Sequence, residues 1–202
     1  MSSLCGVLVP VKSFTEAKVR LAPALGAEDR ATLAREMAEV VLAAARPLPV
    51  AVVCDDEEVA AWARGQNAEV FWRPERGLNG AVLDGVGRFA DRGFARVIVA
   101  HADLPLAQEL GPVGDFDGVT LVPDRRDDGT NVICVPADAG FAFHYGPGSF
   151  RRHLAEAERL GLPVRIERDR RLGWDVDQPP DLDLPPDLDH AAYRAPARSD
   201  QQ

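Results

Sequence analysis

Short apolar runs alternate with amphipathic helical stretches along the first hundred residues of the chain. The segments follow one another in this order, apolar runs and helical stretches in turn: 4–9, 29–46, 50–54, 55–64, 69–72, 80–91 and 97–100. Strand, helix and strand in succession, with short connections, are typical of parallel strands joined by crossover helices. The pattern therefore predicts an α/β fold with a mostly parallel sheet and helices on both faces.

The pattern changes after residue 100. Residues 118–122 and 131–135 have the composition of strands, but the polar stretch 123–130 between them is too short for a crossover helix. We expect these two strands to pair as a hairpin or to flank an excursion from the sheet. A helix that opens at 146–149 and runs to residue 160, and a short strand at 164–167, complete the pattern.

Composition and charge limit the class of protein. With 202 residues, of which 46% are hydrophobic and 27% charged, the chain suits one soluble domain. We place this domain at residues 1–189 and a flexible tail at 190–202. The formal net charge of −9 argues against binding to nucleic acid or to a membrane surface, because both need a basic face.

The location of the protein is predicted from its cysteines and its apolar runs. Cys5, Cys54 and Cys134 stand among apolar residues and fit core thiols in a reducing compartment. The sequence shows no signal peptide, and no apolar run approaches the ~20 residues of a membrane span. We therefore expect a cytoplasmic protein.

A lone carboxylate, Asp103, follows the apolar run that ends at residue 100. Ligands of open α/β sheets bind beyond the carboxyl ends of the strands, so Asp103 lies where a site is expected. A turn residue or a helix cap explains the same aspartate. Asp175 and Asp177 stand at i and i+2, so on an extended segment they point the same way. The three carboxylates suit a hard divalent cation, and a turn before the proline-rich tail is the alternative for the later two.

The chain has two lysines, Lys12 and Lys18, and both lie with Arg20 in the loop after the first apolar run. A compact ammonium, in a chain that otherwise uses arginine, indicates a contact with phosphate. Chance clustering and a solvated basic loop are the alternatives. The loop has neither the glycine pattern of a dinucleotide site nor a Walker motif, so both of those sites are excluded.

Two further loops carry polar residues, Asp128-Gly129-Thr130-Asn131 and Gly146-Pro147-Gly148-Ser149. The second opens a helix, where unpaired backbone N–H groups, the Ser149 hydroxyl and the helix dipole make an anion site. An ordinary loop with an N-cap is the alternative. His101 and His144 lie near these loops, but they show no metal-ligand spacing and we assign them no role.

Seven motifs occur in the order seen in one family. They are Val9-Pro10-Val11-Lys12, Ala17-Lys18-Val19-Arg20-Leu21, Gly77-Leu78-Asn79, Ala102-Asp103-Leu104-Pro105, Asp128-Gly129-Thr130-Asn131, Gly146-Pro147-Gly148-Ser149-Phe150 and Asp175-Val176-Asp177. As a set they resemble the guanylyltransferases of deazaflavin coenzyme F-420 biosynthesis, which act on 2-phospholactate or phosphoenolpyruvate. The resemblance covers most of the chain. It implies a single nucleotidyltransferase domain of the glycosyltransferase-A-like kind, with a Rossmann-like, mostly parallel sheet and a small β excursion.

The resemblance also implies a role for each polar cluster. The magnesium ligands would be Asp103, Asp175 and Asp177. The residues that receive the phospho-acid would be Thr130, Gly146 and Ser149. The residues that face the GTP phosphates would be Lys12, Lys18 and Arg20, with Lys18 and Asp103 as the catalytic pair. The loop Gly77-Leu78-Asn79 would contact the base, with Asn79 as its nucleotide-binding residue. The charged loop 124–128 departs from the family pattern.

The expected reaction is attack by a phosphate oxygen of the acceptor on the α-phosphorus of GTP, with release of pyrophosphate. This displacement needs two anions held in line and their charge neutralised, and it needs no general base because the acceptor phosphate is already ionised. The arginine-rich composition indicates a high-GC bacterium, where the resemblance leans toward phosphoenolpyruvate. The expected partners are these small molecules, and a homodimer is allowed for.

Two alternatives to this function stay open at the level of sequence. The first is a nucleotidyltransferase for another acceptor, such as a sugar phosphate or molybdopterin. The absence of a Gly-Gly turn after the first strand counts against it. The second is a nucleotide-binding regulator without catalysis, which the three aspartates disfavour.

Overall fold

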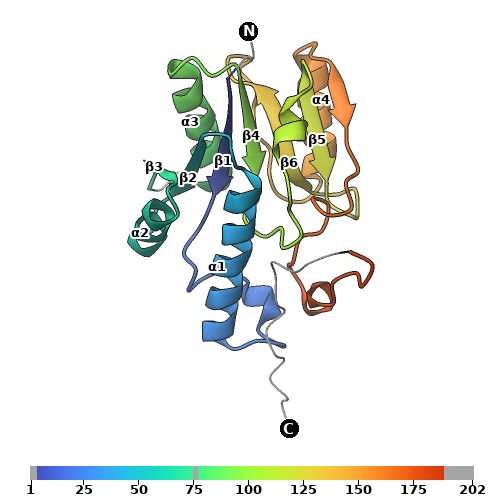
Figure 1. The fold of residues 1–202 in the computed structure, drawn as a ribbon. Helices are drawn as coiled ribbons and strands as arrows, with labels where there is room; N and C mark the ends of the chain where they lie inside the picture. Colours follow the sequence, from blue (N-terminus) through green and yellow to red (C-terminus); the bar gives the residue numbers. More distant parts are fainter. Residues whose placement is uncertain (1–3, 75–76, 189–202) are drawn as a thin grey trace.

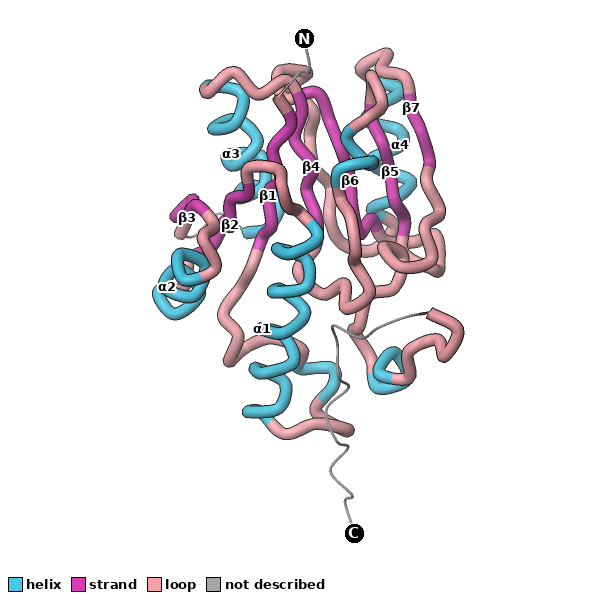
Figure 2. Tube along the Cα trace, in the orientation of Figure 1, coloured by secondary structure: helices cyan, strands magenta, loops and turns pink. Residues whose placement is uncertain are grey.

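The computed structural model describes residues 4–74 and 77–188, and its centre is one seven-stranded sheet (Figures 1 and 2). The strands are β1 (Cys5–Pro10), β2 (Val50–Cys54), β3 (Glu69–Trp72), β4 (Arg96–Ala100), β5 (Val119–Pro123), β6 (Thr130–Pro136) and β7 (Val164–Ile166). Their order in the sheet is β3-β2-β1-β4-β6-β5-β7. The predicted domain limit at residue 189 and the predicted tail 190–202 lie outside the described residues and stay predictions.

The sheet is mostly parallel, as predicted. β1 pairs in parallel with β2 and β4, β2 with β3, and β5 with β7. β6 runs antiparallel to both of its neighbours, β4 and β5. The predicted hairpin is thus β5 and β6, because the short polar connection between them forces the second strand to return antiparallel.

Helices cover both faces of the sheet (Figure 1). The helices are α1 (Ala27–Ala44), α2 (Glu57–Gly65), α3 (Gly77–Asp91) and α4 (Ser149–Arg159). One buried core holds residues of α1 and α2, and a second holds residues of α3 and α4. Val7 and Val9 of β1 belong to the first core, whereas Leu8 between them belongs to the second. A strand buried on both faces explains why the apolar run is continuous and does not alternate.

The helix α3 begins three residues earlier than the sequence predicts. Gly77-Leu78-Asn79, predicted as a loop, forms its first turn. Gly77 adopts a φ of 59°, a conformation that favours glycine. Further along the helix, a Cβ on Gly85 would lie 2.5 Å from Leu8 Cδ2, so this glycine lets α3 pack closely on β1. Packing therefore explains the glycine at position 85, whereas a Cβ on Gly87 would meet no neighbour within 4 Å.

A third, smaller core joins the two ends of the described chain. It contains Leu21 and Leu25 from the loop after β1, Leu33 and Met37 from α1, and Val176 and Leu182 from the C-terminal segment. Val176 is fully buried, and its N–H donates to the carbonyl oxygen of Asp103 at 3.2 Å. The apolar residue inside Asp175-Val176-Asp177 therefore anchors both aspartates beside the cationic loop.

The cysteines agree with the interpretation as core thiols. All three are free, with Cys54 and Cys134 buried and Cys5 partly buried. In the described part of the chain, no helix has the length and apolar character to cross a bilayer.

Candidate active site

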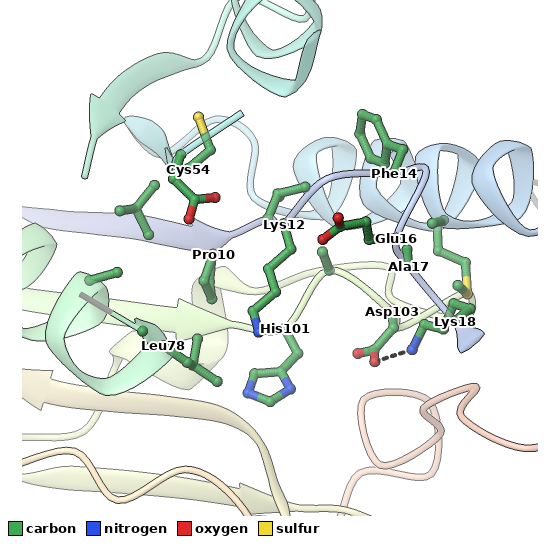
Figure 3. A pocket seen from close by; sticks show the side chains of 18 of the residues that line it. Pro10, Lys12, Phe14, Glu16, Ala17, Lys18, Cys54, Leu78, His101 and Asp103 are labelled. Carbon is green, nitrogen blue, oxygen red and sulfur yellow. Dashed lines mark hydrogen bonds and ion pairs between the residues drawn. The ribbon is translucent and has the colours of Figure 1, made fainter. Parts of the chain in front are cut away.

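A cavity of about 420 Å³ opens at the carboxyl ends of β1, β2 and β4 (Figure 3). Its walls are the loop after β1, the ends of β2 and β4, and the first turn of α3. Lys12, Lys18, His101 and Asp103 line it, and in Figure 3 the Lys12 side chain extends toward His101. The volume lies in the range of small-molecule sites, so the cavity is the candidate nucleotide pocket.

Lys18 bridges two of the predicted magnesium ligands. Its Nζ lies 2.5 Å from Asp103 Oδ2 and 2.9 Å from Asp177 Oδ1. Burial disfavours the charged lysine, but the attraction of Asp103 and then of Asp177 outweighs it, so the pKa of Lys18 is raised. Burial likewise opposes the charged carboxylate of Asp103, yet its pKa is lowered, chiefly by Lys18 and then by His101. Lys18 and Asp103 therefore face each other as a charged pair.

The other predicted cations border the same cluster. Arg20 Nη1 lies 3.8 Å from Asp177 Oδ2, and most of the Arg20 side chain is exposed. Lys12 is exposed at the rim of the cavity. The structure thus brings Lys12, Lys18 and Arg20 to one edge of the sheet, where Lys12 and Arg20 are exposed and Lys18 is paired with two carboxylates.

Asp175 is the third predicted magnesium ligand, and it lies near enough to Asp103 to be affected by its charge. Burial, and after it the negative charge of Asp103, raises the pKa of Asp175. Asp175 Oδ1 and Asp103 Oδ1 are buried without a hydrogen-bond donor, and the nearest cation to the former, Arg125 Nη1, is 3.5 Å away. Carboxylate oxygens that lack donors fit a hard divalent cation. Across residues 4–74 and 77–188, however, no three His, Cys, Asp or Glu side chains already have metal-binding spacing.

The segment 175–178 is held in place by Asp181, which sequence reasoning missed. Asp181 Oδ2 accepts hydrogen bonds from the N–H of Asp177 at 2.9 Å and of Gln178 at 2.8 Å. Arg125 pairs with the same carboxylate and stacks on the Trp174 ring, 4.2 Å from its centroid. The buried Asp181 therefore holds the backbone of the segment that carries Asp175 and Asp177.

The charged loop 124–128 has a structural use. The Asp124 carboxylate closes the turn by accepting hydrogen bonds from the N–H groups of Arg126, Asp128 and Gly129. Arg125 and Arg126 both reach Asp181. The charges that depart from the family pattern therefore pair within the protein and support the segment 175–178.

The two loops predicted to receive the phospho-acid lie against each other. Asp128 accepts hydrogen bonds from Gly148 N–H through Oδ2 at 3.1 Å and from Phe150 N–H through its carbonyl at 3.0 Å. Ser149 N–H donates to the Gly146 carbonyl at 3.0 Å. The expectation of unpaired amides is therefore wrong for Gly148, Ser149 and Phe150, because Asp128 and the Gly146 carbonyl already satisfy them.

Asn79 occupies a different place from the one its predicted role suggests. Its Oδ1 accepts the N–H of Tyr145 at 2.7 Å, which ties α3 to the loop 141–145. Gly77 and Leu78 line the cavity, and Asn79 is not among its lining residues. A contact between Asn79 and the nucleotide stays a prediction; in the structure the side chain positions the loop that precedes Gly146.

His153 and Glu156 of α4 are further residues that sequence reasoning missed. His153 is fully buried; its Nε2 accepts the His144 N–H at 2.9 Å, and its Nδ1 lies 3.0 Å from Thr130 Oγ1. Glu156 Oε1 accepts the Ala142 N–H at 3.0 Å. Both side chains were part of an amphipathic helix in the sequence, and only the contact with loop 141–145 reveals their use.

A pH dependence of stability follows from the burial of His153. Burial, with a smaller effect from His144, His101 and Arg152, lowers its pKa from 6.5 to about 3, while Glu156 opposes the shift. The folded state therefore binds fewer protons, so this contribution to stability is present above pH 6.5 and is lost as pH falls toward 3. Between pH 7 and pH 5, we expect wild type to lose about 2 kcal/mol more unfolding free energy than His153→Gln. Urea unfolding of both proteins at the two pH values checks this, and equal losses would contradict it.

Comparison with known proteins identifies the family. The model of the family "Guanylyl transferase CofC like" matches residues 5–184. A phosphoenolpyruvate guanylyltransferase of Sphaerobacter thermophilus is 35% identical, over 86% of this chain and 88% of the relative. A 2-phospho-L-lactate guanylyltransferase of Methanocaldococcus fervens is 29% identical, over 87% of this chain and 81% of the relative.

A solved structure agrees on the fold. A protein from Desulfovibrio desulfuricans G20, described as a nucleotide-diphospho-sugar transferase, superposes with a TM-score of 0.69 at 20% identity, over 88% of this chain and 84% of that one. This likeness supports the nucleotidyltransferase fold predicted from the sequence. With the family model covering β1 through the segment that carries Asp175 and Asp177, the chain belongs to the CofC-like guanylyl transferase family.

Proposed function

We propose that the protein transfers GMP from GTP to phosphoenolpyruvate, or with lower preference to 2-phospholactate, and releases pyrophosphate. The observation that carries the proposal is the Lys18–Asp103–Asp177 cluster at the edge of the cavity, in a chain whose relatives are named as guanylyltransferases of these two acids. The relative named for phosphoenolpyruvate has the higher identity. We place the reaction in the biosynthesis of coenzyme F-420 and in the cytoplasm, where GTP is available. The homodimer stays a prediction.

The chain's own residues supply charge and position in this proposal. Lys12, Lys18 and Arg20 neutralise the phosphates of GTP at the carboxyl edge of β1. Thr130, Gly146 and Ser149 hold the acceptor phospho-acid on the β6 and α4 side of the same edge. The acceptor oxygen is thereby brought in line with the α-phosphorus, and the leaving pyrophosphate remains beside the basic loop. Positioning and charge neutralisation account for most of the catalysis of phosphoryl transfer, so no general base is needed.

We propose that Asp103, Asp175 and Asp177 hold Mg²⁺. The two buried carboxylate oxygens without donors, and the raised pKa of Asp175, fit such a cation. When bound, Mg²⁺ supplies positive charge to the phosphate oxygens of the two substrates. Lys18 pairs with Asp103 Oδ2 and Asp177 Oδ1 in this structure, so Asp103 Oδ1 and Asp175 Oδ1 are the oxygens that would remain for the cation.

A pyrophosphate-release assay tests the proposed function. The protein is incubated with each of the four ribonucleoside triphosphates and with phosphoenolpyruvate, 2-phospholactate, 3-phosphoglycerate or a sugar 1-phosphate. We expect the highest kcat/KM with GTP and phosphoenolpyruvate, loss of turnover with EDTA, and recovery with excess Mg²⁺. Turnover with the sugar 1-phosphate alone would contradict the proposal, and tight GTP binding without turnover would indicate a regulator.

A further inference from the structure

The hydrogen bonds of His153 determine which of its ring nitrogens carries the proton. Nε2 accepts the backbone N–H of His144 at 2.9 Å, so in the neutral ring this nitrogen has no proton of its own. The proton therefore lies on Nδ1, which is 3.0 Å from Thr130 Oγ1. His153 is the donor of that bond, and the Thr130 hydroxyl oxygen is the acceptor.

A hydroxyl that accepts a hydrogen bond still has its own hydrogen to donate. The Thr130 side chain is buried, with 1% of the residue exposed, so the hydroxyl cannot donate its hydrogen bond to bulk water. In the described part of the chain, the ring of His153 is the one protein partner of Thr130 Oγ1, and it is itself the donor. The Thr130 hydroxyl thus has no acceptor among the described protein groups, which leaves its hydrogen free to be donated to an oxygen atom of a ligand.

The Thr130 hydroxyl lies at the same edge of the sheet as the rest of the candidate site. Thr130 is the first residue of β6, and the next residue, Asn131, accepts the N–H of His101 through its carbonyl at 2.9 Å. Asp103 follows His101 by two residues. The Thr130 hydroxyl therefore contacts α4 through His153, while the backbone beside it pairs with the segment that leads to Asp103.

We propose that His153 is a positioning residue of the acceptor site, resting on the function proposed above. Its Nδ1–H holds the Thr130 hydroxyl in the orientation that donates to an anionic oxygen of the phospho-acid. Its Nε2 separately secures loop 141–145 through His144. One buried side chain thus orders two parts of the acceptor site, through two different nitrogen atoms.

Two amide substitutions separate these roles. In His153→Gln, the side-chain oxygen can reach the Nε2 position and accept the His144 N–H, but the donor to Thr130 is lost. In His153→Asn, the side-chain nitrogen lies near the Nδ1 position and can donate to Thr130, but the His144 N–H loses its acceptor. Thr130→Val removes the hydroxyl, and Thr130→Ser keeps it as the matched control.

The KM of the acceptor distinguishes positioning from general support of the fold. For His153→Gln and for Thr130→Val, we expect the KM of phosphoenolpyruvate to rise about ten-fold, and the KM of GTP to stay within about twofold. The acceptor KM should rise less in His153→Asn than in His153→Gln, and less in Thr130→Ser than in Thr130→Val, with a lower Tm for His153→Asn. The double variant His153→Gln/Thr130→Val should be no worse than either single variant, because both remove the same link.

Other results would overturn the proposal. They are an unchanged acceptor KM in His153→Gln, a rise in both KM values together, or a double variant whose effect is the product of the two single effects. If His153→Asn is too unstable to assay, the acceptor KM values of Thr130→Ser and of the double variant still test the positioning role of His153.

A failure of the proposed function is recognised separately. If wild type releases no pyrophosphate from GTP with phosphoenolpyruvate, the proposed function is wrong. The affinity of the protein for phosphoenolpyruvate, measured by calorimetry, then tests the positioning role of His153. Binding about ten-fold weaker in His153→Gln than in wild type supports its role; equal binding, or none to wild type, overturns it.

Discussion

Asp103→Asn is expected to lower kcat about a thousand-fold while the protein stays folded. The substitution removes one negative charge without a change of volume. Asp103 is the residue at which the Lys18 pair, the buried unpaired oxygen Oδ1 and the carboxyl end of β4 coincide. A neutral amide neither binds a divalent cation well nor balances the ammonium. Steady-state pyrophosphate release measures the loss, and circular dichroism checks the fold.

Asp138→Asn is the matched control for this experiment. Asp138 is an exposed residue in the turn after β6, and the same change of charge is made there at a distance from the site. Its turnover should stay within about twofold of wild type, as is usual for surface substitutions. An active Asp103→Asn enzyme with an unchanged dependence on Mg²⁺ would return Asp103 to the role of a turn residue.

Lys18→Met is expected to lower kcat/KM for GTP about a hundred-fold and also to destabilise the fold. The charge is lost from the phosphate side of the site, and Asp103 and Asp177 lose their shared partner. Breaking a buried ion pair costs about 3–5 kcal/mol, but the Asp177 side chain is 40% exposed. We therefore expect a fall in unfolding free energy of about 2 kcal/mol, measured by urea unfolding with EDTA present.

The double variant Lys18→Met/Asp103→Asn controls for the cause of the instability. A neutral amide at position 103 needs no counter-ion, so the double variant should lose less stability than the sum of the two single variants. Simple addition of the two losses would show that Lys18 does not stabilise the fold through its pair with Asp103.

The strands are the part of the fold that the sequence predicts best. Buried strands such as β2 and β4 are continuous apolar runs bounded by polar residues, so their limits are local properties of the chain. The helix α3 was less predictable, because the reason for Gly85 in its interior is a contact with Leu8, a residue far away in sequence. Local patterns define elements, whereas packing decides where glycine is tolerated.

The residues of the candidate site likewise include some that the sequence indicates and others that only the structure reveals. Asp103 and Lys12 could be named as candidates from sequence because ligands of open α/β sheets bind beyond the carboxyl ends of the strands. The two lysines also stood out because the chain otherwise uses arginine.

Asp181 caps the short helix Pro179–Leu182 through the N–H groups of Asp177 and Gln178, four and three residues before it, so its signal is local. Asn79 and His153, in contrast, act through bonds to the backbone of loop 141–145. Such bonds leave no periodicity or spacing in the chain. The free amides expected at the start of α4 failed for this reason too, since Asp128 satisfies two of them from a loop 20 residues away.

The small core around Val176 joins an early and a late segment of the chain, so it can form only after the late segment has been translated. Lys18 and Asp177 are 159 residues apart, and Val176 and Leu182 belong to the last segment of the described chain to leave the ribosome. All seven strands are translated by residue 166, before either Asp175 or Asp177. A transcript broken after β7 would therefore encode every strand of the sheet but neither of the two later aspartates proposed to hold Mg²⁺. Under that proposal, translation of the final segment completes the metal site.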